Sequence, residues 1–222
     1  MGARVRQNLI KLIPEGDVGS SKLIVKQIPV GKMANFVYLV VEEESREAMV
    51  VDSGWETEPI EEAVRLTGAK VKFAVASHEH FDHVLTLRKL ADNLGARVVA
   101  HESSPIDCDE RVADGEELGL GDSKVQVLHT PGHTEDSICL YDGREVFTGD
   151  TLFVGTIGKF DRVRAEAIYR SLHEVILKLP GQTVMYPGHD YGSVTFRSLR
   201  EEKEANPFLM TRDLRDFLAF FS

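Results

Sequence analysis

Cysteine is nearly absent from this chain of 222 residues, which contains only Cys108 and Cys139. Two thiols cannot form the disulfide framework that stabilises many secreted domains, so the sequence favours a reducing, cytoplasmic environment. Cys139 lies in the apolar run 137–141 and is expected to be an inert core residue. Cys108 lies in an acidic segment and is assigned no role.

Basic side chains are also scarce, with 26 Lys and Arg against 36 Asp and Glu and a formal net charge of −10 when histidine is neutral. Proteins that bind nucleic acid or an anionic membrane need a basic face to displace counterions, so this balance argues against both partners. An excess of carboxylates together with neutral histidines is instead typical of a chain that binds metal cations.

Long apolar runs are missing as well. The N-terminal segment Met1–Ile10 is charged and is followed by no extended apolar stretch, so we expect neither a secretory signal nor a membrane span. Repeats, low-complexity tracts and linker-like composition are equally lacking. We therefore expect one domain over residues 1–222, with a short helical tail after about residue 193.

Apolar and β-branched runs predict strands, and periodic apolar positions that end at glycine or proline predict helices. The expected strands are Lys22–Val30, Asn35–Val41, Ala48–Val51, Val71–Ala76, Arg97–Ala100, Val125–Leu128, Ser137–Tyr141, Glu145–Phe147 and Thr183–Tyr186. The expected helices are Glu58–Leu66 (with Thr57 as N-cap and Gly68 as C-cap), Val84–Leu94 (ending at Gly95), Ala165–Leu179 and a stretch from Val194 onward. This order predicts an α/β fold of two packed sheets with helices outside.

The strongest chemical signal is the run His78-Glu79-His80-Phe81-Asp82-His83, which directly follows an apolar strand. Side chains two residues apart in an extended segment point the same way, so His78 and His80 can face one metal ion. Asp82 and His83 follow as the chain turns and can face a neighbouring position. Three histidines and an aspartate within six residues predict a metal site.

Further ligands have to come from elsewhere in the fold. Three candidates each lie beside glycine in a loop after an apolar strand: His133 in TPGHT, Asp150 in TGDT and His189 in PGHDYG. Loops at strand ends are where catalytic groups gather. Asp52 also ends a strand and is the natural carboxylate to orient a ligating histidine. The remaining histidines, His101, His129 and His173, are expected to be structural or surface groups.

In this order, from about Asp52 to His189, the motifs resemble those of the metallo-β-lactamase superfamily. Within it, the segment Thr148–Phe153 (TGDTLF) looks like the glyoxalase II branch, hydroxyacylglutathione hydrolase, and its relative persulfide dioxygenase. The resemblance implies a four-layer αββα sandwich with metal at the edge of the two sheets. It further implies the ligand sets, which are His78, His80 and His133 for a first ion, Asp82, His83 and His189 for a second, and Asp150 bridging both.

Two features bear on the choice within this branch. Glyoxalase II carries a sizeable C-terminal helical region that grips glutathione, whereas this chain ends 33 residues after His189 and its tail resembles persulfide dioxygenases. Both relatives usually carry a Gly-Cys-Gly-Arg run after the bridging aspartate. Here the run is Thr156-Ile157-Gly158-Lys159, and lysine lacks the planar fork with which arginine grips a carboxylate.

Two reactions therefore stay open. The first is hydrolysis of a thioester or related ester, with two divalent ions (zinc favoured, iron or manganese also compatible) holding a hydroxide nucleophile that Asp82 orients. The alternative is a persulfide dioxygenase with one Fe(II) at His78, His133 and Asp150. Tyr191 is expected to hydrogen-bond into either site. Lys159, Arg162 and Arg164 are expected to form an electropositive rim.

In either case the expected partner is a small thiol-derived substrate. Neither nucleic acid nor a membrane is expected to bind, and homo-oligomer formation is left open by the sequence.

Overall fold

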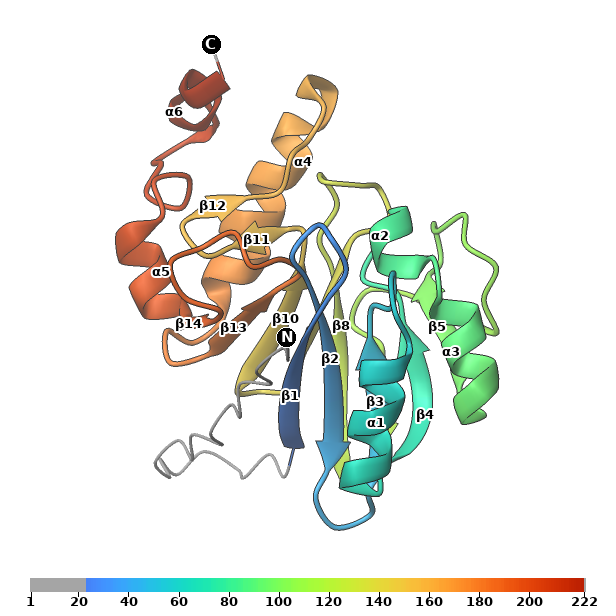
Figure 1. The fold of residues 1–222 in the computed structure, drawn as a ribbon. Coiled ribbons are helices and arrows are strands. Elements are labelled where there is room, and N and C mark those ends of the chain that lie inside the picture. The colour runs from blue at the N-terminus through green and yellow to red at the C-terminus, as the bar shows by residue number, and fades with distance from the viewer. Residues whose placement is uncertain (1–22, 222) are drawn as a thin grey trace, which may run out of the picture.

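The computed structural model describes residues 23–221, which form two six-stranded sheets and helices on their outer faces (Figure 1). The first sheet has the order β1-β2-β3-β4-β5-β6. Its strands are β1 (Leu23–Val30), β2 (Asn35–Glu42), β3 (Glu47–Val51), β4 (Lys70–Val75), β5 (Arg97–His101) and β6 (Glu110–Val112). The N-terminal segment 1–10, for which no leader was expected, lies outside the described residues, as does Lys22 of the first expected strand.

The second sheet has the order β14-β13-β10-β9-β8-β7. Its strands are β7 (Glu117–Leu120), β8 (Ser123–His129), β9 (Ile138–Tyr141), β10 (Glu145–Gly149), β13 (Val184–Pro187) and β14 (Arg197–Ser198). A small hairpin of β11 (Leu152–Phe153) and β12 (Thr156–Ile157) follows β10.

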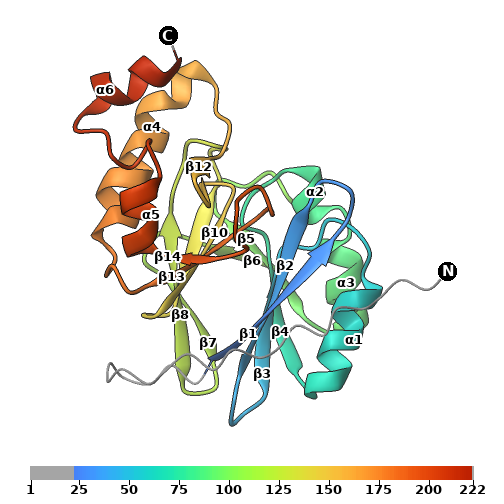
Figure 2. The same cartoon turned by 60° about the vertical axis from the view of Figure 1, so that its left-hand side comes forward.

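Helices cover the outer face of each sheet, so the layers run αββα (Figure 2). The first sheet carries α1 (Glu58–Thr67), the short α2 (Phe81–Val84) and α3 (Leu87–Leu94). The second carries α4 (Ala165–Arg170), α5 (Leu199–Ala205) and α6 (Leu214–Leu218). Helix α4 is preceded by the 3₁₀ turn η1 (Arg162–Arg164) and continues as the π-helical η2 (Ser171–Val175) and the 3₁₀ turn η3 (Ile176–Lys178). The 3₁₀ turn η4 (Ala219–Phe221) follows α6. The predicted α/β sandwich is confirmed.

Strand β2 shows why the sheets pack on both faces. Every residue of β2 is buried, and successive side chains point to opposite faces of a sheet. Phe36, Tyr38 and Val40 therefore enter the core between the two sheets. Val37 and Leu39 point the other way and pack beneath α1. A continuous apolar run is what such a doubly covered strand requires.

Several expected elements differ from those observed. The helix expected over Val84–Leu94 is split into α2 and α3, because Thr86 turns its hydroxyl to the carbonyls of Ser53 and Trp55. Thr57 occupies the N-cap position of α1, but its backbone is already helical and its side chain caps nothing. Gly68 and Gly95 do end their helices in the left-handed conformation, as expected.

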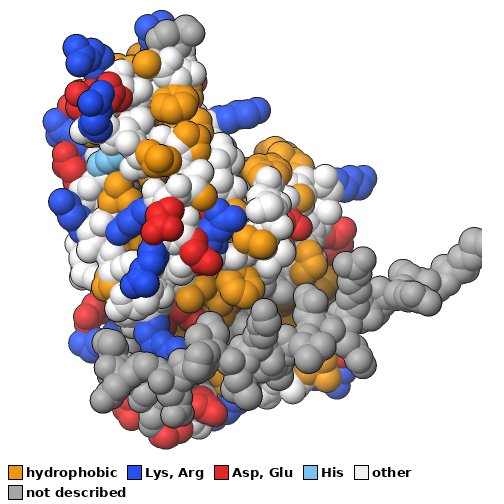
Figure 3. All heavy atoms as spheres, turned by 90° about the vertical axis from the view of Figure 1, so that its left-hand side faces the viewer, with side chains coloured by type: hydrophobic (Ala, Val, Ile, Leu, Met, Phe, Trp, Pro, Cys, Tyr) orange, Lys and Arg blue, Asp and Glu red, His pale blue; other side chains and the backbone are white. Residues whose placement is uncertain are grey.

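The C-terminal stretch expected to be helical from Val194 onward does contain helices, but they begin later than predicted. Arg197 and Ser198 form strand β14 beside β13, and α5 starts only at Leu199. Ser198 caps α5, since its hydroxyl accepts from the Glu201 backbone N–H while the Glu201 carboxylate accepts from the Ser198 backbone N–H. On the face that carries this C-terminal segment, acidic, basic and apolar side chains are interspersed (Figure 3). Within residues 23–221, no helix has the length and apolar character needed to cross a lipid bilayer.

Candidate metal centre

Seven side chains that the sequence singles out as metal ligands lie together at one edge of the two sheets. Strands β8, β10 and β13 point in the same direction, so their carboxyl ends meet at that edge. The loop after β4 joins them from the other sheet, where the backbone N–H of Ile138 donates to the Ser77 carbonyl over 2.8 Å. The seven are His78, His80, Asp82, His83, His133, Asp150 and His189.

The first group contains His78, His80 and His133. One ring nitrogen from each lies within 4.8 Å of the others. Nε2 of His133 is 2.9 Å from Nδ1 of His80. His78 is buried at the bottom of the group and His80 is exposed at its mouth, so the group opens to solvent on one side.

The second group contains Asp82, His83 and His189, and all three are buried. Nε2 of His83 is 3.1 Å from Nε2 of His189. Oδ2 of Asp82 lies 3.4 Å from Nε2 of His189 and 3.6 Å from Nε2 of His83. Two nitrogens and one oxygen therefore converge on one point.

Asp150 lies between the groups and reaches both. Its Oδ2 is 3.5 Å from Nε2 of His133 in the first group and 3.4 Å from Nε2 of His189 in the second. Its Oδ1 is 3.3 Å from Nε2 of His83. A single carboxylate that faces histidines of two groups has the position of a bridging ligand.

The partners of the outer ring nitrogens show which way the lone pairs of the histidines point. Nδ1 of His83 donates to Asp52 Oδ2 over 2.8 Å, Nδ1 of His133 to the Lys159 carbonyl over 2.6 Å, and Nδ1 of His189 to the Met33 carbonyl over 2.8 Å. With the proton on Nδ1, each Nε2 presents a lone pair to the centre of the cluster. Asp52, which the sequence predicts to orient a ligating histidine, thus accepts a hydrogen bond from the candidate ligand His83.

Two observations test whether these residues fit a metal ion. The Nε2 atoms of His83 and His189 face each other across 3.1 Å, and their lone pairs would repel unless a proton or a metal ion lay between them. Nε2 of His78 is fully buried and has no hydrogen-bond partner, while its Nδ1 lies 3.0 Å from the Ser77 hydroxyl. An unpaired buried nitrogen is costly, and a metal ion satisfies it. The histidine and carboxylate donors suit zinc, iron or manganese.

The pKa values of the buried groups follow from the same geometry. Burial, together with the charge of His83, holds the pKa of His78 well below its ordinary value, so His78 is neutral. Burial opposes ionisation of Asp150, but His83 and His189 outweigh it and hold the pKa of Asp150 well below its usual range. Burial likewise disfavours charged His83, yet Asp52 and Asp150 raise its pKa well above the ordinary value. A metal ion would displace that proton.

The residues predicted to lie on the substrate side of the cluster have differing contacts. The Tyr191 ring, 52% exposed, stacks on His189 at 4.6 Å and is in edge contact with Phe153. Lys159 is exposed, and its backbone carbonyl, rather than its ammonium group, contacts the cluster through His133. Arg162 is exposed beside Leu218 and Phe221.

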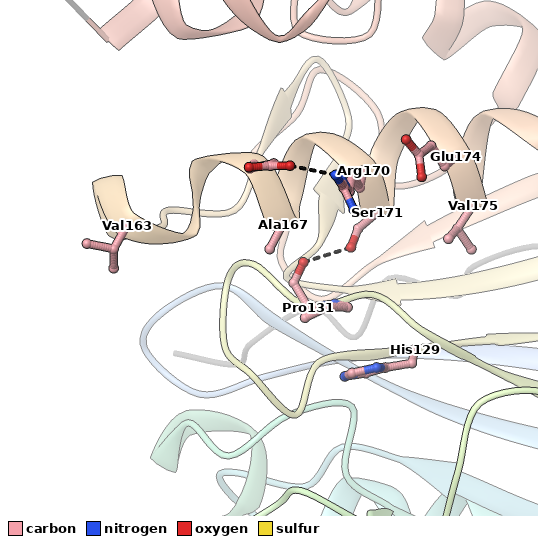
Figure 4. A pocket seen from close by; sticks show the side chains of 9 residues that line it. His129, Pro131, Val163, Ala167, Arg170, Ser171, Glu174 and Val175 are labelled. Atoms are coloured by element: carbon pink, nitrogen blue, oxygen red, sulfur yellow. Dashed lines mark hydrogen bonds and ion pairs between the residues drawn. The ribbon is translucent and has the colours of Figure 1, made fainter.

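The three histidines that were expected to be structural or surface groups lie outside the cluster. The His101 and His129 rings stack at 3.9 Å, and His129 donates to the Glu135 carbonyl. His173 stacks on Tyr169. His129 and Pro131 also line an open groove beside α4 (Figure 4), where the Ser171 hydroxyl donates to the Pro131 carbonyl over 2.7 Å.

Two contributors were missed from the sequence. Asn35 is 2% exposed and donates to Asp82, and Ser77 donates to both carboxylate oxygens of Asp52. Ser77 precedes the histidine run, and that proximity could have suggested a role. Asn35 carries no such signal, since it lies 47 positions before Asp82 at the start of an apolar strand.

The sequence profile of the metallo-β-lactamase superfamily matches residues 30–106 and 101–189, which contain all seven clustered residues. The chain belongs to the metallo-β-lactamase superfamily. The bovine (Bos taurus) mitochondrial persulfide dioxygenase ETHE1 is 33% identical over 193 residues, covering 84% of this chain and 76% of the bovine protein. A probable hydroxyacylglutathione hydrolase of Schizosaccharomyces pombe is 34% identical over 191 residues, covering 79% of this chain and 72% of that protein.

A solved structure of this superfamily has the same overall fold. The crystal structure of ETHE1 from Myxococcus xanthus matches with a TM-score of 0.80 and 32% sequence identity, covering 89% of each chain. The resemblance stated from the motifs is thereby confirmed for the superfamily, and relatives of both the hydrolase and the dioxygenase kind are present. Both relatives carry the names of enzymes. This chain has a cluster of histidine and aspartate whose side chains could hold a metal ion.

Proposed function

We propose that this protein is a metal-dependent hydrolase of the glyoxalase II-like type, which cleaves a small thioester. The observation that carries the proposal is the position of Asp150, whose two carboxylate oxygens face histidines of two separate ligand groups. Such an arrangement suits two divalent ions, with zinc favoured by the histidine-rich donors. The first would be held by His78, His80 and His133, and the second by Asp82, His83 and His189.

The ions would lower the pKa of a bound water from about 15.7 towards roughly 7 and polarise the substrate carbonyl. The chain itself orients the reactants. The Asp82 carboxylate lies at the second group and can accept a hydrogen bond from the attacking water. A thiolate leaving group needs little help from an acid, so no further proton donor is required.

The substrate would enter past the exposed side of the first group. Tyr191 stands beside His189 with half of its side chain exposed, so its hydroxyl is available to bind the substrate. We propose Lys159, Arg162 and Arg164 as an electropositive rim for an anionic thiol derivative. The Arg164 guanidinium donates to the His133 carbonyl over 3.4 Å, which supports its place in this rim. A cytoplasmic location is part of the same proposal, because both cysteines are free thiols.

A second candidate is a persulfide dioxygenase with one Fe(II). The observation in its favour is the similarity to ETHE1 of Bos taurus and of Myxococcus xanthus over most of the chain. His78, His133 and Asp150 would supply the two-histidine, one-carboxylate face that leaves positions open for substrate and oxygen. The remaining clustered residues would then be polar neighbours of the iron.

Elemental analysis of protein purified without added metal, paired with two assays, separates the candidates. The hydrolase predicts two zinc-like ions per chain and thioester cleavage that proceeds without oxygen. One iron per chain with persulfide-dependent oxygen uptake, and no thioester cleavage, would overturn it.

The metal centre itself is tested with His133→Ala. We expect its catalytic rate to fall by more than about 100-fold. Loss of a residue that only hydrogen-bonds to a ligand already lowers metal affinity or activity by about 10–100-fold, and loss of the ligand itself should lower it further. The matched control is His129→Ala, four positions earlier, whose ring contacts His101 and the Glu135 carbonyl instead. Unchanged metal content and activity in His133→Ala would contradict the assignment.

A further inference from the structure

The turn between β1 and β2 holds the loop that carries His189. The Met33 carbonyl accepts from Nδ1 of His189, and the Ala34 carbonyl accepts from the Asp190 backbone N–H, each over 2.8 Å. The Phe36 backbone N–H donates to the Gly188 carbonyl over the same distance. The first hairpin of the chain is therefore part of the second ligand group, although it supplies no ligand.

Asn35, at the start of β2, connects this hairpin to the other side of the second group. Its side-chain amide donates to Asp82 Oδ2 over 2.9 Å and to the Asp82 carbonyl over 3.1 Å. Both amide protons are therefore used on the same ligand residue. A neutral donor can hold a carboxylate oxygen in place without neutralising the charge that attracts a cation.

Trp55 fixes the Asn35 amide in turn. The indole Nε1–H donates to Asn35 Oδ1 over 2.7 Å, which leaves only one orientation of the amide with its NH₂ towards Asp82. The indole is held by packing, since its ring contacts Phe81 at 6.1 Å and lies over Gly31. A Cβ at Gly31 would come within 2.2 Å of that ring, and the φ of +67° at Gly31 also favours glycine.

This chain of contacts reaches only one ligand group. Asp82 Oδ2, which accepts from Asn35, is the same oxygen that faces His189 and His83. The first group has other outer partners, the Lys159 carbonyl for His133 and the Ser77 hydroxyl for His78. A change at Asn35 or Trp55 should therefore alter the metal affinity of the second group and leave that of the first unchanged.

We infer that Asn35, oriented by Trp55, is a positioning residue that sets the affinity of the second ligand group for its metal ion. The inference rests on the two-ion site of the proposed function. On this inference, the β1–β2 hairpin determines whether the site holds one ion or two. This role does not depend on which substrate the protein binds.

The test uses zinc titration of the full chain after chelator treatment, followed by calorimetry. Wild type is expected to bind two zinc ions. In Asn35→Leu, which keeps the branched side-chain shape but has no hydrogen-bonding groups, the second ion should bind about 10–100-fold more weakly while the first keeps its affinity. Trp55→Phe keeps an aromatic ring beside Phe81 and loses the indole N–H, so we expect a weakening of about 10-fold for the second ion only.

The matched control is Gln27→Leu in the same hairpin. The Gln27 amide donates to the Tyr38 hydroxyl and the Thr195 carbonyl, away from the ligands, so both zinc affinities should stay at wild-type values. If Asn35→Leu fails to fold, Trp55→Phe decides alone.

Equal weakening of both ions, no change in either variant, or a wild type that binds a single zinc overturns the inference. A wild type that binds two zinc ions without cleaving thioesters contradicts the proposed hydrolase and leaves this inference standing.

Discussion

At the scale of single residues, the site is defined by where protons are placed. Asp52 shows this most clearly, because its two oxygens accept from the Ser77 backbone N–H, the Ser77 hydroxyl and Nδ1 of His83. The His83 proton is thereby held on the outer nitrogen. Asp52 itself has a φ of 61°, a conformation that aspartate and asparagine tolerate better than most residues.

Asp52→Asn tests this arrangement. Asparagine fits the same backbone, but its NH₂ must face either the Ser77 or the His83 donor, so one hydrogen bond is lost. We expect the affinity for the second zinc ion to fall by about 10–100-fold in the same titration. Asp109→Asn, which also receives a backbone N–H, from Val98, lies outside the cluster and should bind zinc as wild type does. Wild-type affinity in Asp52→Asn would contradict the role.

At the scale of elements, the site depends on loops pressed against neighbouring helices. Gly132, one residue before His133, packs so closely on α4 that a Cβ there would lie 2.5 Å from the Cα of Ile168. Its φ of +143° is also unfavourable for other residues. The position of His133 is therefore set by the contact of its loop with α4 as well as by strand β8.

Gly132→Ala should push this loop away from α4. We expect weaker zinc binding at the first group and a loss of stability, because neither the backbone of α4 nor that of the loop can yield cheaply. Chemical denaturation and zinc titration measure the two effects. Gly119→Ala is the control, since a Cβ there meets nothing within 4 Å. The idea fails if the two variants behave alike.

Strand β10 carries a group whose charge state depends on burial. Desolvation, reinforced by Asp142, raises the pKa of Glu145 to about 8. The folded state therefore keeps a proton that the unfolded chain loses above about pH 4.5. The free energy of unfolding should therefore fall as the pH rises from about 4.5 to about 8, by at most about 1.4 kcal/mol per pH unit.

Glu145→Gln removes that dependence. We expect the variant to be more stable than wild type above pH 8, with the difference vanishing towards pH 4. Urea unfolding at a series of pH values measures it, with the exposed Glu102→Gln as control. Parallel pH profiles for Glu145→Gln and wild type would disprove the burial argument.

At the scale of the whole molecule, the cluster joins two sheets. His78, His80, Asp82 and His83 follow a strand of the first sheet, whereas His133, Asp150 and His189 follow strands of the second. A metal ion bound by both halves favours the folded state over the unfolded chain. Each ion adds about 2.7 kcal/mol to the free energy of unfolding when its free concentration is 100 times its dissociation constant.

Chelation should therefore lower the thermal unfolding temperature, and added zinc should restore it. Differential scanning calorimetry with and without chelator measures the shift. His133→Ala should show a smaller shift than wild type, because it loses one ligand that crosses between the sheets. A melting temperature that chelator leaves unchanged would show that the ions do not join the two halves.

Much of the fold and the candidate ligand set was predictable from the sequence, because both depend on patterns of neighbouring residues. The continuous apolar run of Asn35–Val41 and the glycines that end α1 and α3 are patterns within a few residues. The start of the helix expected from Val194 was misplaced, because pairing of Arg197 with β13 overrides local propensity and α5 begins only at Leu199. The short strands β6, β7, β11 and β12 were missed for the same reason, since they are strands only through their neighbours.

The sequence by itself determined the chemistry: a histidine and aspartate set at strand ends, and the superfamily to which it belongs. Only the tertiary structure decided how that set is arranged, with Asp150 between two groups and the β1–β2 hairpin holding the second. The physical reason is that ligand types are properties of single residues, whereas the orientation of a ligand depends on distant partners. Asn35 and Trp55 reach Asp82 through contacts across 47 and 20 positions of the chain, and no local pattern records them.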